Sequence, residues 1–481
     1  MIDRSDKFCI IGAGSSGIAA AKNFLAAGIP FDCLEREDDV GGNWYFGAPC
    51  SRVYASTHLV SSKPLTEYSD FPMPEKWPDY PSHRQTLAYL RDYARQFGVY
   101  ERIEFGVGVE SVEPARESGQ WAVGGGQELG EGGAVGGADV SEYLDVTGAG
   151  GTLRGRLGVP RRDRAQGWIV RTTNGEARHY RGVVIANGHN WDPRWPEYPG
   201  EFAGEAIHSA SFKSAEMLRG KRVLVVGGGN SGCDIACEAA LHADEAILST
   251  RRAYHILPKF IRGRPVDQAN ELLLWLRVPL WARRVAGAIV SHAALGPAWR
   301  TGVPKPDHRL FESHPILNSL IHHHVGHGRL ALRPDIARFN GSRVEFVDGS
   351  AAEIDLVVYA TGYRVNIPFI DREQLNWQGD APRLFMNVFH PERDDLFCIG
   401  LIQPDSGQFG LVDYQSQLVA RYLQAIDRGS ERAEEFRRLK AAELPDLGSG
   451  VRYIQSPRHT LEVEHYSYRR RLQRLAKRLS R

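Results

Sequence analysis

Several common signatures are missing from this 481-residue chain. Its six cysteines form no CxxC pair, which argues against a disulfide scaffold and favours a reducing, cytoplasmic setting. Its 59 basic and 58 acidic residues nearly cancel, so no charge excess recruits nucleic acid. No run of about 18 uncharged apolar residues occurs. The nearest run, at 271–296, is broken by arginines and a proline, so we expect amphipathic helices there and no transmembrane segment.

A metal centre is also not expected. The segment IHHHVGH, at 321–327, is rich in histidine, but three consecutive residues of a helix point in different directions. Only His323 and His327 have i,i+4 spacing, and no Glu or Cys completes a ligand set.

What the chain does contain is a strand–glycine turn–helix–strand unit at 7–37. Its turn is Gly12-x-Gly14-x-x-Gly17, a spacing that permits a tight turn, close approach of a pyrophosphate, and packing of the helix on the strand. The helix N-terminus would then face the phosphates with free N–H groups. Glu35 follows where a carboxylate can accept hydrogen bonds from a ribose diol.

The same pattern returns at 221–252 with Gly227-x-Gly229-x-x-Gly232. Here the second strand leads into Arg251 and Arg252, and guanidinium groups pair with a 2′-phosphate that a carboxylate would repel. The alternative is that both arginines are solvated surface residues. We assign FAD to the first unit and NADPH to the second, with hydride passing from nicotinamide to flavin.

These two units predict an α/β fold with two Rossmann-like dinucleotide-binding domains, the NADPH domain being inserted into a discontinuous FAD domain. We place the first part of the FAD domain at 1–207, the NADPH domain at 208–365, and the second part of the FAD domain, with a basic tail, at 366–481. A glycine-rich insertion at about 119–158 interrupts the first part. The tail HYSYRRRLQRLAKRLSR has leucines at helical spacing, so it is a solvated terminal helix or a peripheral membrane contact.

The stretch FAGEAIHSASF lies just before the second unit and matches FxGxxxHxxx(Y/F) through Phe202, Gly204, His208 and Phe212. With it, the chain resembles the flavin-containing monooxygenase family, the class B flavoprotein monooxygenases, over nearly its whole length. The related Baeyer–Villiger enzymes typically carry Trp at the last position, so Phe212 favours the flavin-containing branch. The other matching motifs are GGNW (Gly41, Gly42, Trp44), GGGNSG (including Asn230 and Ser231) and YATGY (including Thr361 and Gly362).

This resemblance implies that NADPH reduces FAD, that O₂ adds to the flavin as a C4a-hydroperoxide, and that an amine nitrogen or a sulfide sulfur of a small molecule takes the distal oxygen. The segment GLIQPDSGQFG resembles the family's segment that closes over the flavin, with Gln403 as the expected polar contact. The connector would let one lobe turn against the other, with Gly204 as a backbone hinge and His208 as a polar latch between the lobes.

One departure from the family concerns coupling. The family carries an Asn just ahead of its SSK-like segment, and here that position falls on Val60 or Ser61. Val60 cannot hydrogen-bond the cofactors as an amide would, although Ser61 or Ser62 could substitute. We therefore predict uncoupled turnover, in which part of the NADPH consumed reduces O₂ to hydrogen peroxide without forming an oxygenated product.

Three alternatives stay open: Baeyer–Villiger oxidation of a ketone, a non-oxygenating NADPH oxidase or regulatory flavoprotein, and a disulfide reductase. The last would need a cysteine pair near the flavin, which the sequence does not offer. A homodimer is compatible with the sequence.

Overall fold

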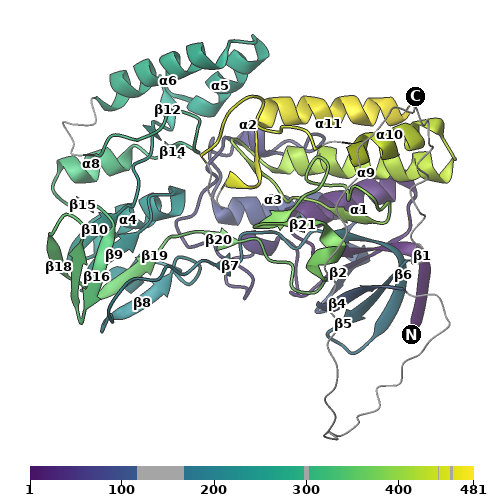
Figure 1. The fold of residues 1–481 in the computed structure, drawn as a ribbon, viewed down its shortest axis with the longest axis horizontal. Coiled ribbons are helices and arrows are strands. Elements are labelled where there is room, and N and C mark those ends of the chain that lie inside the picture. The colour runs from purple at the N-terminus through teal and green to yellow at the C-terminus, as the bar shows by residue number, and fades with distance from the viewer. Residues whose placement is uncertain (116–166, 297–302, 443, 455–458, 481) are drawn as a thin grey trace, which may run out of the picture.

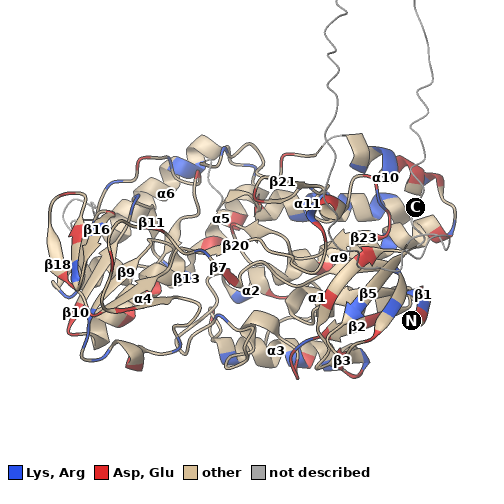
Figure 2. Ribbon diagram, turned by 60° about the horizontal axis from the view of Figure 1, so that its bottom comes forward, with Lys and Arg blue, Asp and Glu red and all other residues tan. Residues whose placement is uncertain are grey.

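The computed structural model describes residues 1–115, 167–296, 303–442, 444–454 and 459–480 as two lobes side by side, each built on a mostly parallel sheet (Figure 1). The predicted glycine-rich insertion at 119–158 lies outside the described residues. Its flanking strands, β4 (Val109–Pro114) and β5 (Trp168–Thr172), pair antiparallel as neighbours. Charges of both signs are spread over both lobes (Figure 2).

The first sheet has the order β3-β2-β1-β6-β5-β4, and β23 pairs with β6. β1, β2, β3, β6 and β23 run parallel. Their apolar segments are buried on both faces, as a parallel sheet covered by helices requires. The other strands of this sheet are β1 (Ile2–Ile11), β2 (Phe31–Glu35), β3 (Ile103–Phe105), β6 (Ala177–Ile185) and β23 (Leu396–Cys398).

The C-terminal part of the chain returns to this first lobe. α9 (Phe409–Asp427) packs on α1 (Ser15–Ala27), and α11 (His465–Ser480) packs on α9, along the upper edge in Figure 1. A long aromatic cluster, including Tyr68, Tyr93 and Phe409, joins α3 (His83–Gln96) to this layer. The lobe is therefore made of the beginning and the end of the chain.

The second sheet is fully parallel, with the order β15-β10-β9-β19-β8. β8 (Glu205–His208) comes from the connector, so this sheet begins three residues before the predicted limit at 208. α4 packs on the sheet, α8 packs against α4, and α6 lies over β11. Its elements are β9 (Arg222–Val226), α4 (Asn230–His242), β10 (Glu245–Ser249), α8 (Leu320–Gly326), β15 (Ala331–Arg333) and β19 (Leu356–Tyr359), with β11 (Ile256–Leu257), α5 (Val266–Trp275) and α6 (Leu280–Leu295) outside it.

Short elements complete the two lobes. They are η1 (Gly42–Trp44), α2 (Lys63–Thr66), η2 (Tyr100–Arg102), β7 (Asp192–Pro193), η3 (Ala215–Leu218), β12 (Phe260–Ile261), β13 (Arg264–Pro265), β14 (Ile316–Leu317), β16 (Ile336–Asn340), β17 (Arg343–Phe346), β18 (Ala351–Glu353), β20 (Tyr363–Arg364), η4 (Arg372–Leu375), β21 (Trp377–Gln378), β22 (Ala381–Pro382), β24 (Gln403–Pro404), α10 (Glu431–Ala442) and β25 (Glu462–Val463).

The basic tail forms α11, as its leucine spacing predicts. Leu472, Leu475 and Leu479 are all buried against the first lobe, while the arginines between them face outward. The leucines are thus used within the fold and are not presented to a membrane.

Candidate cofactor sites

The first glycine turn joins β1 to α1 and leaves room where a cofactor would approach. Gly12 has φ +98°, and a Cβ there would lie 2.9 Å from the carbonyl oxygen of Ala186. A Cβ on Gly17 would lie 1.7 Å from the oxygen of Gly12. A Cβ on Gly14 would meet only the backbone of Gly42, its Cα at 3.7 Å and its nitrogen at 3.9 Å. Gly12 and Gly17 therefore serve the turn itself, and Gly14 borders open space.

Glu35 stands at the end of β2 beside this turn, 7% exposed. One carboxylate oxygen accepts the Ala13 N–H at 2.6 Å, and the other accepts the Glu37 N–H at 3.0 Å. Burial raises the pKa of Glu35. The carboxylate is thus fixed at the mouth of the turn, where its remaining lone pairs fit a ribose diol.

The GGNW segment closes over the same turn. The Gly41 N–H donates to the Ala13 oxygen at 3.1 Å, and a Cβ on Gly42 would lie 3.1 Å from the Cα of Gly14. Trp44 packs edge-on against Phe409 at 6.4 Å between ring centroids. The structure therefore brings together Gly42, Trp44 and the first turn, which are separated by some 30 residues in the sequence.

The second turn repeats this construction between β9 and α4. Gly227 has φ +116°, and a Cβ on Gly232 would lie 1.8 Å from the Gly227 oxygen. A Cβ on Gly227 would lie 2.5 Å from the oxygen of Ala360. Gly229 is the N-cap of α4, which begins with the predicted Asn230 and Ser231.

The segments that abut the two turns correspond to each other. Ala186-Asn187-Gly188 follows β6, and Ala360-Thr361-Gly362 follows β19, each with its alanine oxygen against a turn glycine. Thr361 donates its hydroxyl hydrogen to the Arg194 oxygen at 2.5 Å, and Asn187 donates an amide hydrogen to the Asn366 oxygen at 3.2 Å. Thr361 and Gly362 were predicted, whereas Asn187 was missed. The repeated Ala-x-Gly after a buried strand was the signal that could have found it.

Arg251 and Arg252 follow β10 and are both exposed. Nε of Arg252 lies 2.8 Å from a carboxylate oxygen of Asp307, whereas Arg251 forms no ion pair within the described part of the chain. Arg251 is therefore the freer of the two for a 2′-phosphate.

The connector residues pack mainly in the second lobe, and Phe212 also contacts the first. Phe202 lies against Phe339, and Phe212, fully buried, lies against Tyr54 of the first lobe at 5.4 Å between ring centroids. A Cβ on Gly204 would lie 2.6 Å from the Phe202 ring, so this glycine serves close packing. Its φ lies outside the left-handed region, so its backbone conformation does not by itself require glycine, and its role as a hinge stays a prediction.

His208 ends β8 and is 1% exposed. Its Nδ1 accepts the Ala210 N–H at 3.1 Å, and its ring lies against Trp195 and Tyr363 at 5.7 and 5.3 Å. Burial lowers the pKa of His208 to about 4. The ring is therefore neutral at physiological pH and adjoins Gly362, in the segment that follows β19.

The pKa of His208 leads to a pH prediction. Between pH 6.5 and 4 the unfolded chain binds a proton at this position that the folded chain does not, so acidification lowers the free energy of unfolding. We expect His208→Asn to reduce this acid-induced loss of unfolding free energy by about 1–2 kcal/mol, a value that allows for solvent screening. Urea unfolding at pH 7 and 5 measures the change in unfolding free energy, and an equal decrease in parent and variant would contradict this prediction.

The segment at 60–62 meets α5 of the second lobe. Ser62, fully buried, is the N-cap of α2, and its N–H donates to a carboxylate oxygen of Asp267 at 2.6 Å. Ser61 is partly exposed, and the Val60 side chain is 37% exposed. The candidate catalytic serines thus lie at the junction of the lobes, where both cofactors would have to meet.

Gln403 lies in β24, where its side-chain amide donates to Glu462 at 3.1 Å. The residues just before it do reach the first turn, because a Cβ on Gly400 would lie 2.0 Å from the Ser16 hydroxyl oxygen at the start of α1. Gln408 donates to the Gly400 oxygen at 3.2 Å. A polar contact from Gln403 to a cofactor stays a prediction.

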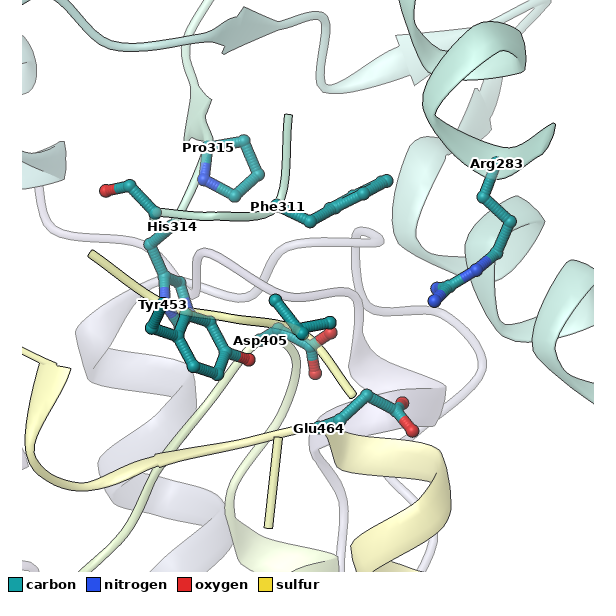
Figure 3. Close-up of a pocket in the computed structure, with 9 residues that line it drawn as sticks. Arg283, Phe311, His314, Pro315, Asp405, Tyr453 and Glu464 are labelled. Carbon is teal, nitrogen blue, oxygen red and sulfur yellow. The ribbon is translucent and has the colours of Figure 1, made fainter. Parts of the chain in front are cut away.

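A small hollow lies where the lobes meet, lined by residues that include His314, Asp405 and Glu464 (Figure 3). His314 crosses from the second lobe, its Nε2 2.9 Å from the Pro404 oxygen and its Nδ1 2.8 Å from Glu462. Burial and the neighbouring Glu464 raise the pKa of Asp405 to about 6. Arg283 extends from α6 toward these two carboxyl groups in Figure 3. The two contacts of His314 fasten the second lobe to the C-terminal part of the first.

Across the described ranges, no helix has the length and apolarity to cross a bilayer. Two glycine turns of the same build, one beside a buried carboxylate and one beside arginines, define a flavoprotein with separate FAD and NADPH lobes. The open space at Gly14 and the fixed carboxylate of Glu35 fit FAD, and the free guanidinium of Arg251 fits NADPH.

Comparison with known proteins then gives the family. The model for flavin-binding monooxygenase-like proteins matches residues 5–139 and 164–441, and the chain belongs to this family. It is 28% identical over 483 residues to flavin-containing monooxygenase 5 of Oryctolagus cuniculus, covering 95% of this chain and 80% of that protein. It is 28% identical over 438 residues to a human putative dimethylaniline monooxygenase, described as N-oxide-forming, covering 87% of this chain and 72% of that protein.

Among solved structures, the closed form of a cyclohexanone monooxygenase has the same fold, with a TM-score of 0.65 at 18% identity, covering 99% of this chain and 98% of that one. The predicted two-domain α/β fold, the family and the cofactor pair are confirmed. The protein is a flavin-dependent monooxygenase that uses FAD and NADPH.

Proposed function

We propose that this monooxygenase oxygenates the nitrogen or sulfur atom of a small soft nucleophile, with NADPH as reductant and O₂ as oxidant. The observation that carries the proposal is Phe212, the aromatic residue of the connector motif at the position where Baeyer–Villiger enzymes typically have Trp. The N-oxide-forming description of the human relative supports an amine as substrate. Bound FAD, once reduced by NADPH, supplies the activation of O₂.

The residues of the two sites have separate roles in this proposal. FAD is held by Gly12, Gly14, Gly17, Glu35, Gly42 and Trp44. NADPH is held by Gly227, Gly229, Asn230, Ser231, Gly232, Arg251, Arg252, Thr361 and Gly362. Ser62, His208 and Phe212 are each buried, and in this proposal they help to exclude water from the space between the cofactors.

Products formed from N,N-dimethylaniline, methyl phenyl sulfide and cyclohexanone, incubated side by side with NADPH and air, test the proposal. We expect an N-oxide and a sulfoxide to form in preference to a lactone. A lactone as the main product would instead establish the Baeyer–Villiger alternative, and consumption of NADPH without any organic product would establish an oxidase.

We also propose that turnover is partly uncoupled because Val60 offers no hydrogen bond where the family has an Asn amide. Val60→Asn should lower the ratio of hydrogen peroxide formed to NADPH consumed by about 5-fold, which corresponds to the net free energy of one hydrogen bond. Peroxide and product are measured per NADPH, with Val60→Ala as the control for the loss of the branched side chain. A parent enzyme that already couples NADPH to product one to one would contradict this proposal.

We propose that α5 and α6, which carry exposed apolar side chains, make a peripheral membrane contact. Trp275 and Trp281 are 64% and 70% exposed, and Val285 and Ile289 continue the outer face of α6. α6 also contains no acidic residue. Replacing both tryptophans by serine should weaken co-sedimentation with anionic vesicles at least about 10-fold, whereas Leu241→Ser, at an exposed position of α4, should not. Equal sedimentation of both variants would contradict it.

A further inference from the structure

A groove of ≈ 790 Å³ lies in the first lobe between α10, α11 and the loop at 444–449. Its lining includes no residue of either glycine turn. Its volume falls within the range of about 300–1,000 Å³ that small-molecule sites occupy. The oxygenation chemistry makes no use of this part of the fold.

The floor of the groove is apolar. Phe385, Leu439, Leu444 and Leu475 line it, and the Leu439 side chain is 40% exposed. An alkyl chain laid along these side chains would remove apolar surface from water on both partners, which is the main source of favourable free energy for such a ligand.

One wall of the groove is basic. Arg471, Arg474 and Arg478 follow i, i+3, i+7 spacing on one face of α11, over about 10 Å, and Figure 2 shows the basic residues of this helix in blue. In the part of the chain that the structure describes, none of the three forms an ion pair. Arg474 and Arg478 are exposed, so their guanidinium groups can reach a ligand.

Among the described residues, the lining holds one carboxylate, Asp446, which is already engaged. Its two oxygens accept the N–H groups of Gly448 and Gly450 at 2.9 and 3.0 Å, and its backbone oxygen accepts a hydrogen bond from Arg471 at 3.3 Å. The groove therefore combines an excess of positive charge on one wall with an apolar floor.

We propose that this groove binds a fatty-acid anion, with its carboxylate on Arg474 and Arg478 and its alkyl chain along the leucines. A guanidinium group pairs with a carboxylate through two parallel N–H···O bonds, which fixes the position of the head group. A small anion would leave the floor uncovered, and a neutral alcohol would leave the guanidinium groups without a partner.

The groove is connected to the FAD turn by hydrogen bonds. Tyr468, in its floor, accepts a hydrogen bond from the Gln415 amide at 2.7 Å, and the Gln415 oxygen accepts the Gly400 N–H at 2.9 Å. Gly400 in turn packs against Ser16 at the start of α1. A ligand that shifts Tyr468 can therefore change the surroundings of the flavin through contiguous contacts.

Isothermal titration of the FAD-loaded full chain with laurate, below its micelle concentration, tests the binding. We expect laurate to bind, and dodecanol and acetate to bind at least about 10-fold more weakly, because each lacks one half of the interaction. The double variant Arg474→Gln, Arg478→Gln should lose at least about 10-fold in laurate affinity. Arg470→Gln is the matched control, since Arg470 is exposed on the same helix but does not line the groove.

The proposal is overturned if laurate does not bind, if dodecanol binds as tightly, or if the double variant and Arg470→Gln behave alike. A second readout follows the visible absorbance of bound FAD during the titration. We expect laurate to change it in the parent and not in the double variant, and binding without any change would overturn the connection through Tyr468. Neither readout depends on turnover, so both are independent of the oxygenation substrate.

Discussion

Replacing Gly14 by alanine is expected to give a folded protein that no longer retains FAD. The backbone of Gly14 has φ −69°, which any residue adopts, and an added Cβ would meet the protein only at an ordinary contact distance of 3.7 Å. The methyl group would instead occupy the space where the backbone must approach a pyrophosphate. We expect FAD affinity to fall roughly 10- to 100-fold, as overpacking of a fitted site does.

The measurement compares the FAD content of the purified protein with the Tm of the apoprotein. Gly17→Ala provides the contrast, because its Cβ would lie 1.7 Å from the Gly12 oxygen and would push α1 off β1. That variant should lose both FAD and thermal stability, whereas Gly14→Ala should lose FAD alone. Full flavin retention by Gly14→Ala would show that the pyrophosphate does not approach this residue.

The sequence was sufficient to predict the two turns because their requirements are local. The glycine spacing, the strand before it and the alanine-rich helix after it are all fixed within about 30 residues, the length of one βαβ unit. The return of the C-terminal segment to the first lobe was also predictable, although only through the family resemblance. The structure confirms it through the packing of α9 on α1.

Contacts between distant segments were not predictable in the same way. Nothing near Gln403 indicates that Glu462 accepts its amide hydrogen, and nothing near Gly204 indicates that the Phe202 ring and the Asp355 oxygen fill the space beside it. The leucines of the basic tail gave a helix from their spacing, but only the fold shows that α9 covers them. Periodicity gives the apolar face of an element, and the partner of that face depends on tertiary packing.

The two arginines after β10 illustrate the same limit, and they differ in a way that can be measured. Both were expected to pair with a 2′-phosphate, but Arg252 lies 2.8 Å from Asp307, while Arg251 has no such neighbour among the described residues. A carboxylate beside Arg252 competes with the phosphate for its guanidinium group, so the greater share of NADPH recognition should fall to Arg251.

We therefore expect Arg251→Gln to raise the Kd for NADPH about 10- to 100-fold, the value of a charge-assisted hydrogen bond, and to leave that for NADH nearly unchanged. Arg252→Gln should have a smaller effect, and Asp307→Asn should strengthen NADPH binding by releasing Arg252. Anaerobic flavin reduction at varied NADPH and NADH concentrations gives both constants. If Arg251→Gln weakened both nucleotides equally, the arginine would contact a group that they share, and the preference for NADPH would have to come from elsewhere in the second lobe.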